Sequence, residues 1–358
     1  MSLEERRKEI DRIDSEIVRL IAERLKNAEA IGHEKNLKGL PVTDPAREKI
    51  VLKKVRGLAR KVNINEDALE SLYKEIMKLA KSVEGVSVAY QGEAGAYSEE
   101  AAFRFFGQGV KTLPCETLDE VFKAVGADEV KHGLIPIENS LEGSITRSYD
   151  LLLESDLKVS GELELRVSHC LIGNPGSNLD TIKRIYSHPQ ALGQSQAFLR
   201  RLGRELVPTY DTAGSVKMVK EKKILDGAAI ASARAAELYG MKILASEIED
   251  NPLNFTRFFI LSREDGPSTG SDRTSVVFSV KHRPGALYDA LYELARRNIN
   301  LTKIESRPTR KKAWDYNFYV DFEGHREDAQ CKEALSALEE RTLFIKMLGS
   351  YPRANGRK

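Results

Sequence analysis

The sequence predicts a multidomain chain: an all-α N-terminal part, a central α/β part with two lobes, and an α+β C-terminal part with a ferredoxin-like order of elements. Its 358 residues exceed what one hydrophobic core usually supports. Apolar residues keep helical spacing to about residue 84 and then alternate as in a strand at VSVAY. The Gly, Ser and Pro residues of GPSTGSD separate two further β-rich runs. The expected domains are residues 1–85, 86–265 and 272–352.

The charge balance and the cysteines exclude several classes of protein. The 56 Lys and Arg residues nearly balance the 54 Asp and Glu residues, which leaves a net charge of +2 and no basic excess for nucleic-acid binding. The three cysteines are scattered and never form CxxC, so neither a disulfide framework nor a zinc site is expected. No apolar run approaches the ~20 residues that span a membrane. We expect a cytoplasmic protein that binds no metal, membrane or nucleic acid.

The first 84 residues predict three helices. Asp44 and Pro45 predict the start of the second, which runs to about Lys61, and Asn65 predicts the cap of the third. At about 1.5 Å per residue the first helix reaches roughly 50 Å, too long to bury its apolar side against two short helices. We therefore expect a partner subunit and at least a homodimer. The apolar stripe of this first helix is Leu3, Ile10, Ile13, Ile17, Leu20 and Ile31.

Arg24 lies in phase with this apolar stripe, at a position where a leucine would be expected. A buried guanidinium requires an anion, and a structural ion pair with a carboxylate of a neighbouring helix is the simplest interpretation. However, Arg7, Lys35 and Arg47 add further cations to a segment without a cofactor motif or an obvious nucleophile. Several cations around one helical core favour a small polyanion as the ligand.

The segments RRKEIDRID, AERLKNAEAIGHEK and PVTDPAREKI resemble the helical chorismate mutases over nearly all of residues 1 to 84. The resemblance implies rearrangement of chorismate to prephenate, a pericyclic step that needs positioning and charge stabilisation but no base, metal or cofactor. Lys35 would face the ether oxygen, and Glu84 opposite it must be protonated to donate a second hydrogen bond, so mutase activity would fall as the pH rises. The implied substrate-binding residues are Arg7 of the partner subunit, Arg24, Asp44, Arg47 and Glu48.

Several polar clusters interrupt the strand-like runs between residues 86 and 265. They are the glycine-rich turn YQGEAGAYSEEAA, the strand end HGLIPIENSLEGSI, the segments SHPQALGQ and TAGSV, and NFTRFFIL. Ligands gather at such strand ends in α/β folds. Singly, each has a structural interpretation, since glycine turns open many helices and a lone histidine such as His188 is more often structural than catalytic. Their co-occurrence favours a ligand site.

Together these segments resemble prephenate dehydratases across residues 86 to 263, with ENS and NFTRF as the most specific matches. The resemblance implies a two-lobed fold like that of periplasmic binding proteins, and conversion of prephenate to phenylpyruvate with loss of carbon dioxide and hydroxide. Thr256 would donate a proton to the departing hydroxyl and Arg257 would anchor a carboxylate. The glycine-rich turn departs from the family, for instance in Tyr97 where Phe is usual. The other implied binding residues are Ser98, Glu138, Asn139, Ser140, Ser187, Gln194, Thr212, Ser215 and Phe258.

The residues after 272 predict the ferredoxin-like order strand, helix, strand, strand, helix, strand. Within them, RPGALYDAL and KIESRP resemble the two segments that form the phenylalanine site of ACT domains, while a purely structural module is the alternative. The predicted elements are 274–280, a helix from Pro284 to about Arg297, 299–306, 314–322, 328–340 and 343–348. The implied effector is L-phenylalanine, bound by Gly285, Ala286, Leu287, Glu305, Ser306, Arg307 and Pro308.

The three resemblances together imply a bifunctional enzyme of phenylalanine biosynthesis, a chorismate mutase and prephenate dehydratase that phenylalanine inhibits and that needs no cofactor. Two alternatives stay open. An arogenate dehydratase with a mutase domain would perform the same elimination on the transaminated substrate; the motifs do not separate the two, although a mutase that delivers prephenate favours prephenate. A ligand-binding regulator without chemistry is the second, and Thr256 and the cations of the first helices argue against it.

Overall fold

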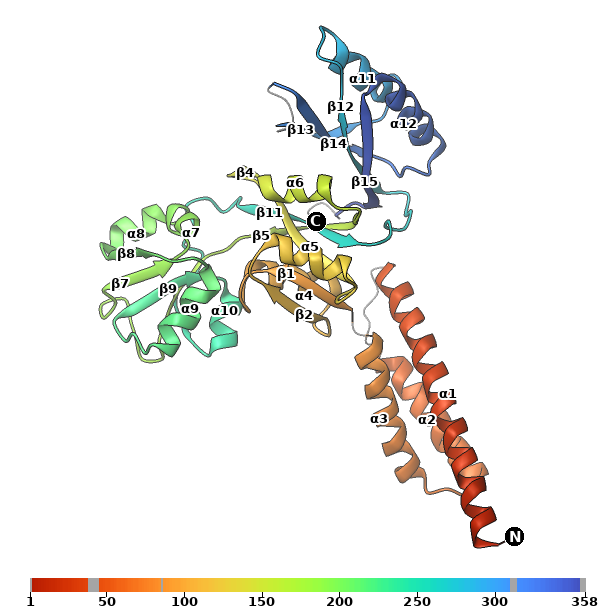
Figure 1. Ribbon diagram of the computed structural model, residues 1–358. Coiled ribbons are helices and arrows are strands. Elements are labelled where there is room, and N and C mark those ends of the chain that lie inside the picture. The colour runs from red at the N-terminus through yellow and green to blue at the C-terminus, as the bar shows by residue number, and fades with distance from the viewer. Residues whose placement is uncertain (1, 38–44, 85, 310–313, 355–358) are drawn as a thin grey trace. The chain divides into compact units, whose positions relative to one another are not determined.

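The computed structural model describes residues 2–37, 45–84, 86–309 and 314–354 (Figure 1). Contacts divide the chain into two compact units. One is Met1–Ser87 with Phe106–Lys111, and the other is Val88–Phe105 with Thr112–Lys358.

The first unit contains the three predicted helices: α1, Leu3–Leu37; α2, Pro45–Lys61; and α3, Glu66–Glu84. The Asn65 side chain caps α3 by accepting a hydrogen bond from the amide of Ala68. Arg56 of α2 joins the two short helices through ion pairs with Asp67 and Glu70 of α3. The apolar stripe of α1 stays exposed, as the length of this helix predicted: Leu3, Ile10, Ile13, Ile17, Leu20 and Ile31.

The second unit begins with an α/β lobe built on one mixed sheet in the order β2-β1-β3-β11-β5, with β4 beside β3. The predicted strands at VSVAY, at residues 134–137 and at residues 258–261 are all part of it. Its strands are β1, Ser87–Gln91; β2, Lys111–Cys115; β3, His132–Asn139; β4, Gly143–Ser144; β5, Lys158–Arg166; and β11, Phe255–Ser262. Its helices are α4, Tyr97–Phe106; α5, Leu118–Gly126; and α6, Thr146–Glu154.

The chain leaves this sheet after β5, builds a second α/β lobe, and returns in β11, which pairs with β5 (Figure 1). The second sheet has the order β10-β6-β9-β7-β8. Its strands are β6, Cys170–Gly173; β7, Arg184–Ser187; β8, Glu205–Pro208; β9, Gly227–Ala231; and β10, Lys242–Ala245. Its helices are α7, Pro189–Gly193; α8, Gln196–Leu202; α9, Thr212–Glu221; and α10, Ala233–Tyr239. The predicted two-lobed architecture is therefore confirmed.

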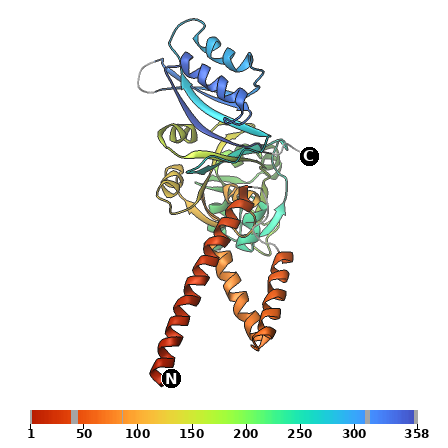
Figure 2. The same cartoon turned by 90° about the vertical axis from the view of Figure 1, so that its right-hand side faces the viewer.

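The last part of the chain has the predicted ferredoxin-like order, in a sheet ordered β13-β14-β12-β15 whose two helices cover one face (Figure 2). Its elements are β12, Asp272–Ser279; α11, Ala286–Ala295; β13, Leu301–Pro308; β14, Tyr316–Glu323; α12, Ala329–Arg341; and β15, Phe344–Pro352. The final strand runs past its predicted end at residue 348, because Pro352 still pairs with Asp272 at the start of β12.

The ferredoxin-like part shares a hydrophobic core with the first lobe. Tyr319, Leu348 and Tyr351 are buried with apolar residues of β3, α6 and β11. Strand β15 approaches β5 so closely that a side chain at Gly349 would overlap the backbone of Val159. The two parts are therefore packed against each other within one unit.

Candidate functional site

The register of β3 and β11 brings two of the predicted motifs together. The strands are antiparallel, and Thr256 lies opposite Asn139 while Arg257 lies opposite Glu138. The register shifts between Arg257 and Phe258, a bulge of the kind that re-aims side chains next to active sites. ENS and NFTRF, distant in sequence, therefore meet at the ends of neighbouring strands.

The Asn139 amide donates to Thr256. Its Nδ2 lies 3.1 Å from the Thr256 Oγ1, and its Oδ1 accepts hydrogen bonds from the backbone amides of Leu141 and Glu142. Since Thr256 Oγ1 accepts this bond, the hydroxyl keeps its own hydrogen for another acceptor. A hydroxyl held in this way is suited to donate a hydrogen bond to a substrate.

A chain of buried and half-buried polar side chains continues from Asn139 into the second lobe. Asn139 Nδ2 donates to Asn254 Oδ1 at 2.7 Å, and Asn254 Nδ2 donates to Gln194 Oε1 at 2.9 Å. His169 Nε2 lies 3.1 Å from the same Gln194 oxygen, and His169 Nδ1 lies 2.8 Å from the Tyr97 hydroxyl. Both lobes therefore contribute to one hydrogen-bonded chain that ends on Thr256.

Three members of this chain, Asn254, His169 and Tyr97, are not among the site residues predicted from the sequence. Asn254 is the first letter of NFTRF, and its position directly before the Thr-Arg pair was a usable signal. His169 stands in the apolar run SHCLIG, where a histidine reads as structural, and it is 2 % exposed. The histidine considered instead, His188, caps α7 by accepting from the amide of Gln190.

The predicted hydroxyl residues of the second lobe are bonded within the protein. Ser187 is buried and its Oγ donates to the carbonyl of Ile230 at 2.7 Å. Ser215, also buried, lies in α9 and donates to the carbonyl of Asp211 at 2.6 Å. Thr212 is the first residue of the same helix. The hydroxyls of Ser187 and Ser215 thus stabilise the backbone of the second lobe. Contacts between these residues and a substrate stay predictions.

The remaining predicted residues of the dehydratase site differ in exposure. Ser140 is exposed, and its Oγ donates to the carbonyl of Leu253 and accepts from the amide of Phe255, which fastens the end of β3 to the start of β11. Ser98 is half-buried in the first turn of α4. Phe258 is 2 % exposed within β11 and belongs to the core of the sheet.

Arg257, predicted to anchor a substrate carboxylate, is surrounded by carboxylates of the protein. Its side chain is 8 % exposed and forms ion pairs with Glu138 at 3.0 Å, Glu162 at 2.6 Å and Asp321 at 2.7 Å. Burial alone lowers the pKa of Arg257, but Asp321, Tyr351 and Glu162 outweigh it and hold that pKa above its ordinary value. In this arrangement the guanidinium is the centre of a structural network, and a substrate contact stays a prediction.

The network extends into the ferredoxin-like sheet. Glu138 pairs with Lys303 of β13 as well as with Arg257. Burial raises the pKa of Glu138, but hydrogen bonds and charge from Lys303 and Arg257 outweigh it, so that pKa lies below its ordinary value. Glu305 and Arg307, predicted to bind the effector, also contact the first lobe: Ser144 Oγ donates to Glu305 at 2.8 Å and Arg307 pairs with Asp150 at 3.2 Å.

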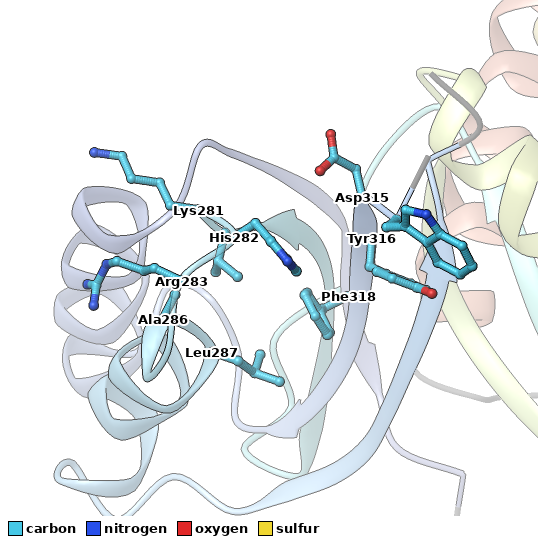
Figure 3. Close-up of a pocket in the computed structure, with 10 residues that line it drawn as sticks. Lys281, His282, Arg283, Ala286, Leu287, Asp315, Tyr316 and Phe318 are labelled. Carbon is cyan, nitrogen blue, oxygen red and sulfur yellow. The ribbon is translucent and has the colours of Figure 1, made fainter. Parts of the chain in front are cut away.

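A cavity of about 160 Å³ lies in the ferredoxin-like part (Figure 3). Figure 3 shows His282, Leu287 and Phe318 facing the same space. The predicted Ala286 and Leu287 line it, and Gly285 caps the start of α11 with a φ of 79°, which suits glycine. The residues that line the cavity are Val280, Lys281, His282, Arg283, Ala286, Leu287, Trp314, Asp315, Tyr316 and Phe318. Among them are none of the predicted residues Glu305, Ser306, Arg307 and Pro308, so one subunit does not bring the two predicted segments together here.

In the first unit, Arg24 of α1 has the feature expected of an anion-binding arginine. Its Nη1 is buried and has no hydrogen-bond partner among the residues that the structure describes. Arg7 is exposed, and Arg47 and Glu48 lie in the first turn of α2. Asp44 and the side chains of Lys35 and Glu84 lie outside the described part of the chain.

Searches of the described residues bear on metals, cysteines and membranes. Residues 2–37, 45–84, 86–309 and 314–354 contain no group of three His, Cys, Asp or Glu side chains placed to hold a metal ion. Cys115, Cys170 and Cys331 are free thiols. None of the helices in these ranges combines the length and apolarity of a membrane span.

Models of three protein families match the chain in succession. The chorismate mutase type II model matches residues 6–85, the prephenate dehydratase model matches residues 88–266, and the ACT domain model matches residues 274–340. These are the families that the sequence motifs resemble, in the same order.

Known proteins match over most of the chain. The bifunctional chorismate mutase/prephenate dehydratase of Aquifex aeolicus is 40 % identical over 358 residues, covering 98 % of each chain. Arogenate dehydratase/prephenate dehydratase 2 of Arabidopsis thaliana is 47 % identical over 278 residues, which cover 75 % of this chain and 73 % of that protein. The solved structure of prephenate dehydratase from Arthrobacter aurescens in complex with L-Phe is 32 % identical, with a TM-score of 0.71, and the match covers 76 % of this chain and 91 % of that one.

Proposed function

The chain belongs to the family of bifunctional chorismate mutase/prephenate dehydratases, and we propose from its sites how it performs the two reactions and how phenylalanine controls them. As a member of this family it converts chorismate to prephenate and prephenate to phenylpyruvate. The proposed division of labour assigns the mutase to residues 1–85, the dehydratase to 86–265 and regulation to 272–352.

The dehydratase step breaks two bonds of prephenate. The bond to the ring carboxylate breaks to release carbon dioxide, its electron pair completes the aromatic ring, and the ring hydroxyl departs as hydroxide, which becomes water on protonation. Decarboxylation that produces an aromatic ring is strongly favourable. The barrier therefore comes from the departure of hydroxide, which is a poor leaving group. A donor aimed at the developing hydroxide lowers this barrier without a cofactor.

The hydrogen bond from Asn139 to Thr256 is the observation that carries the assignment of this donor. Because Thr256 Oγ1 accepts from Asn139 Nδ2 at 3.1 Å, its own hydrogen is available to the departing hydroxyl. The meeting of ENS and NFTRF at neighbouring strand ends supports a site at this place. We assign the proton-donating role to Thr256 and the role of orienting it to Asn139.

The mutase would act in a dimer of the first unit. The exposed apolar stripe of α1 supports burial against a second copy. The buried Nη1 of Arg24 has no partner within the described part of the chain, which supports a carboxylate of chorismate as its acceptor. Arg7 is exposed in the single chain and is therefore accessible to a second one. We propose that Arg7 of the partner subunit completes the set of cations around chorismate. We therefore propose that the oligomer is at least a homodimer.

Phenylalanine would bind the ferredoxin-like part at the cavity beside Ala286 and Leu287. Apolar and aromatic side chains on the walls of this cavity, among them Leu287 and Phe318, suit a phenyl ring. The complex of a similar prephenate dehydratase with L-Phe supports the same effector. Inhibition follows if phenylalanine binds a less active arrangement more tightly, by a coupling of ~1 to 3 kcal/mol.

We propose that the dehydratase prefers prephenate to arogenate. The mutase in the same chain makes prephenate, although the similarity to a plant protein named for both dehydratase activities keeps arogenate as the second candidate. Rates with the two substrates at equal concentration separate them. We also propose a cytoplasmic location, which the three free thiols support.

A time course with chorismate alone tests the whole proposal, with Thr256→Val as the decisive variant. Wild type should accumulate phenylpyruvate without added cofactor, and phenylalanine should suppress it. Thr256→Val keeps the shape of the side chain without its hydroxyl, so chorismate should disappear at the normal rate while prephenate accumulates and dehydratase kcat falls by about 10²- to 10³-fold. Thr256→Ser, which keeps a hydroxyl, should retain much of the activity.

The outcomes are separable because one chain carries both activities. Equal phenylpyruvate formation by wild type and Thr256→Val would remove Thr256 from the mechanism. No turnover of prephenate by wild type, with arogenate consumed, would replace the substrate. No turnover of any of the three substrates would favour the ligand-binding regulator.

A further inference from the structure

His169 is the buried titratable group closest along the hydrogen-bonded chain to the proposed catalytic threonine. It directly precedes β6 and is 2 % exposed. Its ring is held at both nitrogens, by the Tyr97 hydroxyl at Nδ1 and by the Gln194 Oε1 at Nε2. Tyr97 and His169 also pack edge to face, with ring centroids 5.7 Å apart. A side chain fixed on so many sides can fix its neighbours in turn.

The direction of each hydrogen bond follows from the backbone. The amides of Leu141 and Glu142 donate to Asn139 Oδ1, so Asn139 turns its Nδ2 toward Asn254 and must meet an oxygen there. Asn254 then presents its own Nδ2 to Gln194, whose Oε1 must be the acceptor. Every amide of the chain has one orientation once Asn139 is fixed.

This orientation determines the hydrogen on the imidazole. An amide oxygen only accepts, so His169 Nε2 must carry a hydrogen and donate it to Gln194 Oε1. In the neutral ring Nδ1 is then an acceptor, and the single hydrogen of the Tyr97 hydroxyl lies between two acceptors, the Ser168 carbonyl oxygen at 2.7 Å and Nδ1 at 2.8 Å. Burial lowers the pKa of His169, against opposing contributions from Gln194 and Glu249, which favours this neutral form.

We propose that His169 is a positioning residue of the dehydratase: its Nε2 hydrogen fixes the Gln194 amide, and through Asn254 and Asn139 it holds the Thr256 hydroxyl toward the substrate. The proposal rests on the donor role proposed for Thr256. Without His169, Gln194 Oε1 loses one of its two donors and the Gln194 amide can rotate, which leaves Asn254 with a nitrogen facing a nitrogen. Asn139 Nδ2 then loses Asn254 Oδ1, its nearest acceptor, and is aligned beside Thr256 only by the Phe255 carbonyl oxygen at 3.1 Å.

Two amide variants of His169 test this role because their side chains differ in length and place the amide nitrogen at different positions. In His169→Gln the side-chain nitrogen extends to about the position of Nε2 and can still donate to Gln194. In His169→Asn, one methylene shorter, it reaches only the position of Nδ1, beside Tyr97. We expect dehydratase kcat to fall by about 10²-fold in His169→Asn and by less than about 10-fold in His169→Gln, with KM changed by less than about 3-fold in both.

Mutase turnover and thermal unfolding of each variant provide the controls for expression and folding. Equal losses of kcat in two folded variants, wild-type kcat in His169→Asn, or a loss confined to KM would each overturn the proposal. Those patterns belong to a residue that is only structural or that only binds substrate.

The tautomer can be read without turnover if the variants fail to fold. In wild type labelled with 15N-histidine, the imidazole signal that disappears in any folded His169 variant, or that lies closest to Tyr97 in nuclear Overhauser contacts, should report a hydrogen on Nε2. A hydrogen on Nδ1 would overturn the proposal. This measurement is independent of the role of Thr256, so failure of Thr256→Val and failure of the His169 tautomer are distinct results.

Discussion

Arg24 places a charged donor atom, Nη1, at a buried position where none of the described residues accepts a hydrogen bond from it. Its Nη1 is buried without a hydrogen-bond partner among the described residues, a state that costs about 1 to 3 kcal/mol or more for a charged group. An arginine that had been selected only for stability would be expected to have a carboxylate at that atom. The unpartnered nitrogen therefore favours an anionic ligand over a structural ion pair.

Replacement of Arg24 by methionine separates these two interpretations. If Arg24 binds substrate, Arg24→Met should lower mutase kcat/KM by about 10³-fold and leave the thermal midpoint unchanged or higher, since a buried unsatisfied donor is removed. Loss of a buried ion pair would instead destabilise the protein by about 3 to 5 kcal/mol. Arg19→Met is the matched control, because Arg19 lies on the same helix, is 65 % exposed and pairs with Glu23. Calorimetry gives the thermal midpoint of each variant and mutase assays give its kcat/KM. Together the two measurements distinguish substrate binding from a structural ion pair.

At the scale of elements, the ion network makes the junction of β3, β11 and β13 sensitive to acid. The pKa of Glu138 is lowered in the folded protein by Lys303 and Arg257, so its contribution to stability is full above the unfolded pKa of about 4.3 and is lost as the pH falls through the folded value. Glu138→Gln should therefore be less stable than wild type by about 1 to 3 kcal/mol at pH 7. The difference should narrow below about pH 4.

Urea unfolding at a series of pH values checks this expectation. Glu164→Gln, an exposed carboxylate on β5 of the same sheet, is the control and should behave as wild type at every pH. A deficit of Glu138→Gln that stays constant down to pH 3 would show that the lost contact is one of packing, and the role assigned to its charge would be wrong.

Local sequence patterns predicted the helices and strands well, but they did not predict which side chains would form ion pairs or hydrogen bonds with one another. The six elements after residue 272 and the three N-terminal helices follow from periodicity and from caps such as Asn65, because those signals lie within each element. Arg257 is the opposite case: its three carboxylates come from positions 138, 162 and 321, and no local pattern connects them. His169 was missed for the same reason, since its partners depend on how the two lobes meet.

At the scale of the whole molecule, the mutase should require two chains in one active site. The exposed stripe of α1 supports a paired helix, and Arg7, exposed in one chain, would act beside Arg24 of the other. Arg7→Ala and Arg24→Met should each be inactive as mutases. A heterodimer of the two variants has two sites. One site combines Arg24 of the Arg7→Ala chain with Arg7 of the Arg24→Met chain and is intact. The other site lacks both cations.

Mixing the two inactive variants measures this arrangement directly. After unfolding and refolding together, about half of the dimers are mixed and one of their two sites is intact, so mutase activity should return to about a quarter of the wild-type rate. Dehydratase activity should stay at the wild-type level in each variant and in the mixture, which controls for refolding. If Arg7 acted on the site of its own chain, every site in the mixture would lack one cation and no activity would return. The recovered rate therefore distinguishes a shared site from two separate ones, whatever holds the chains together elsewhere.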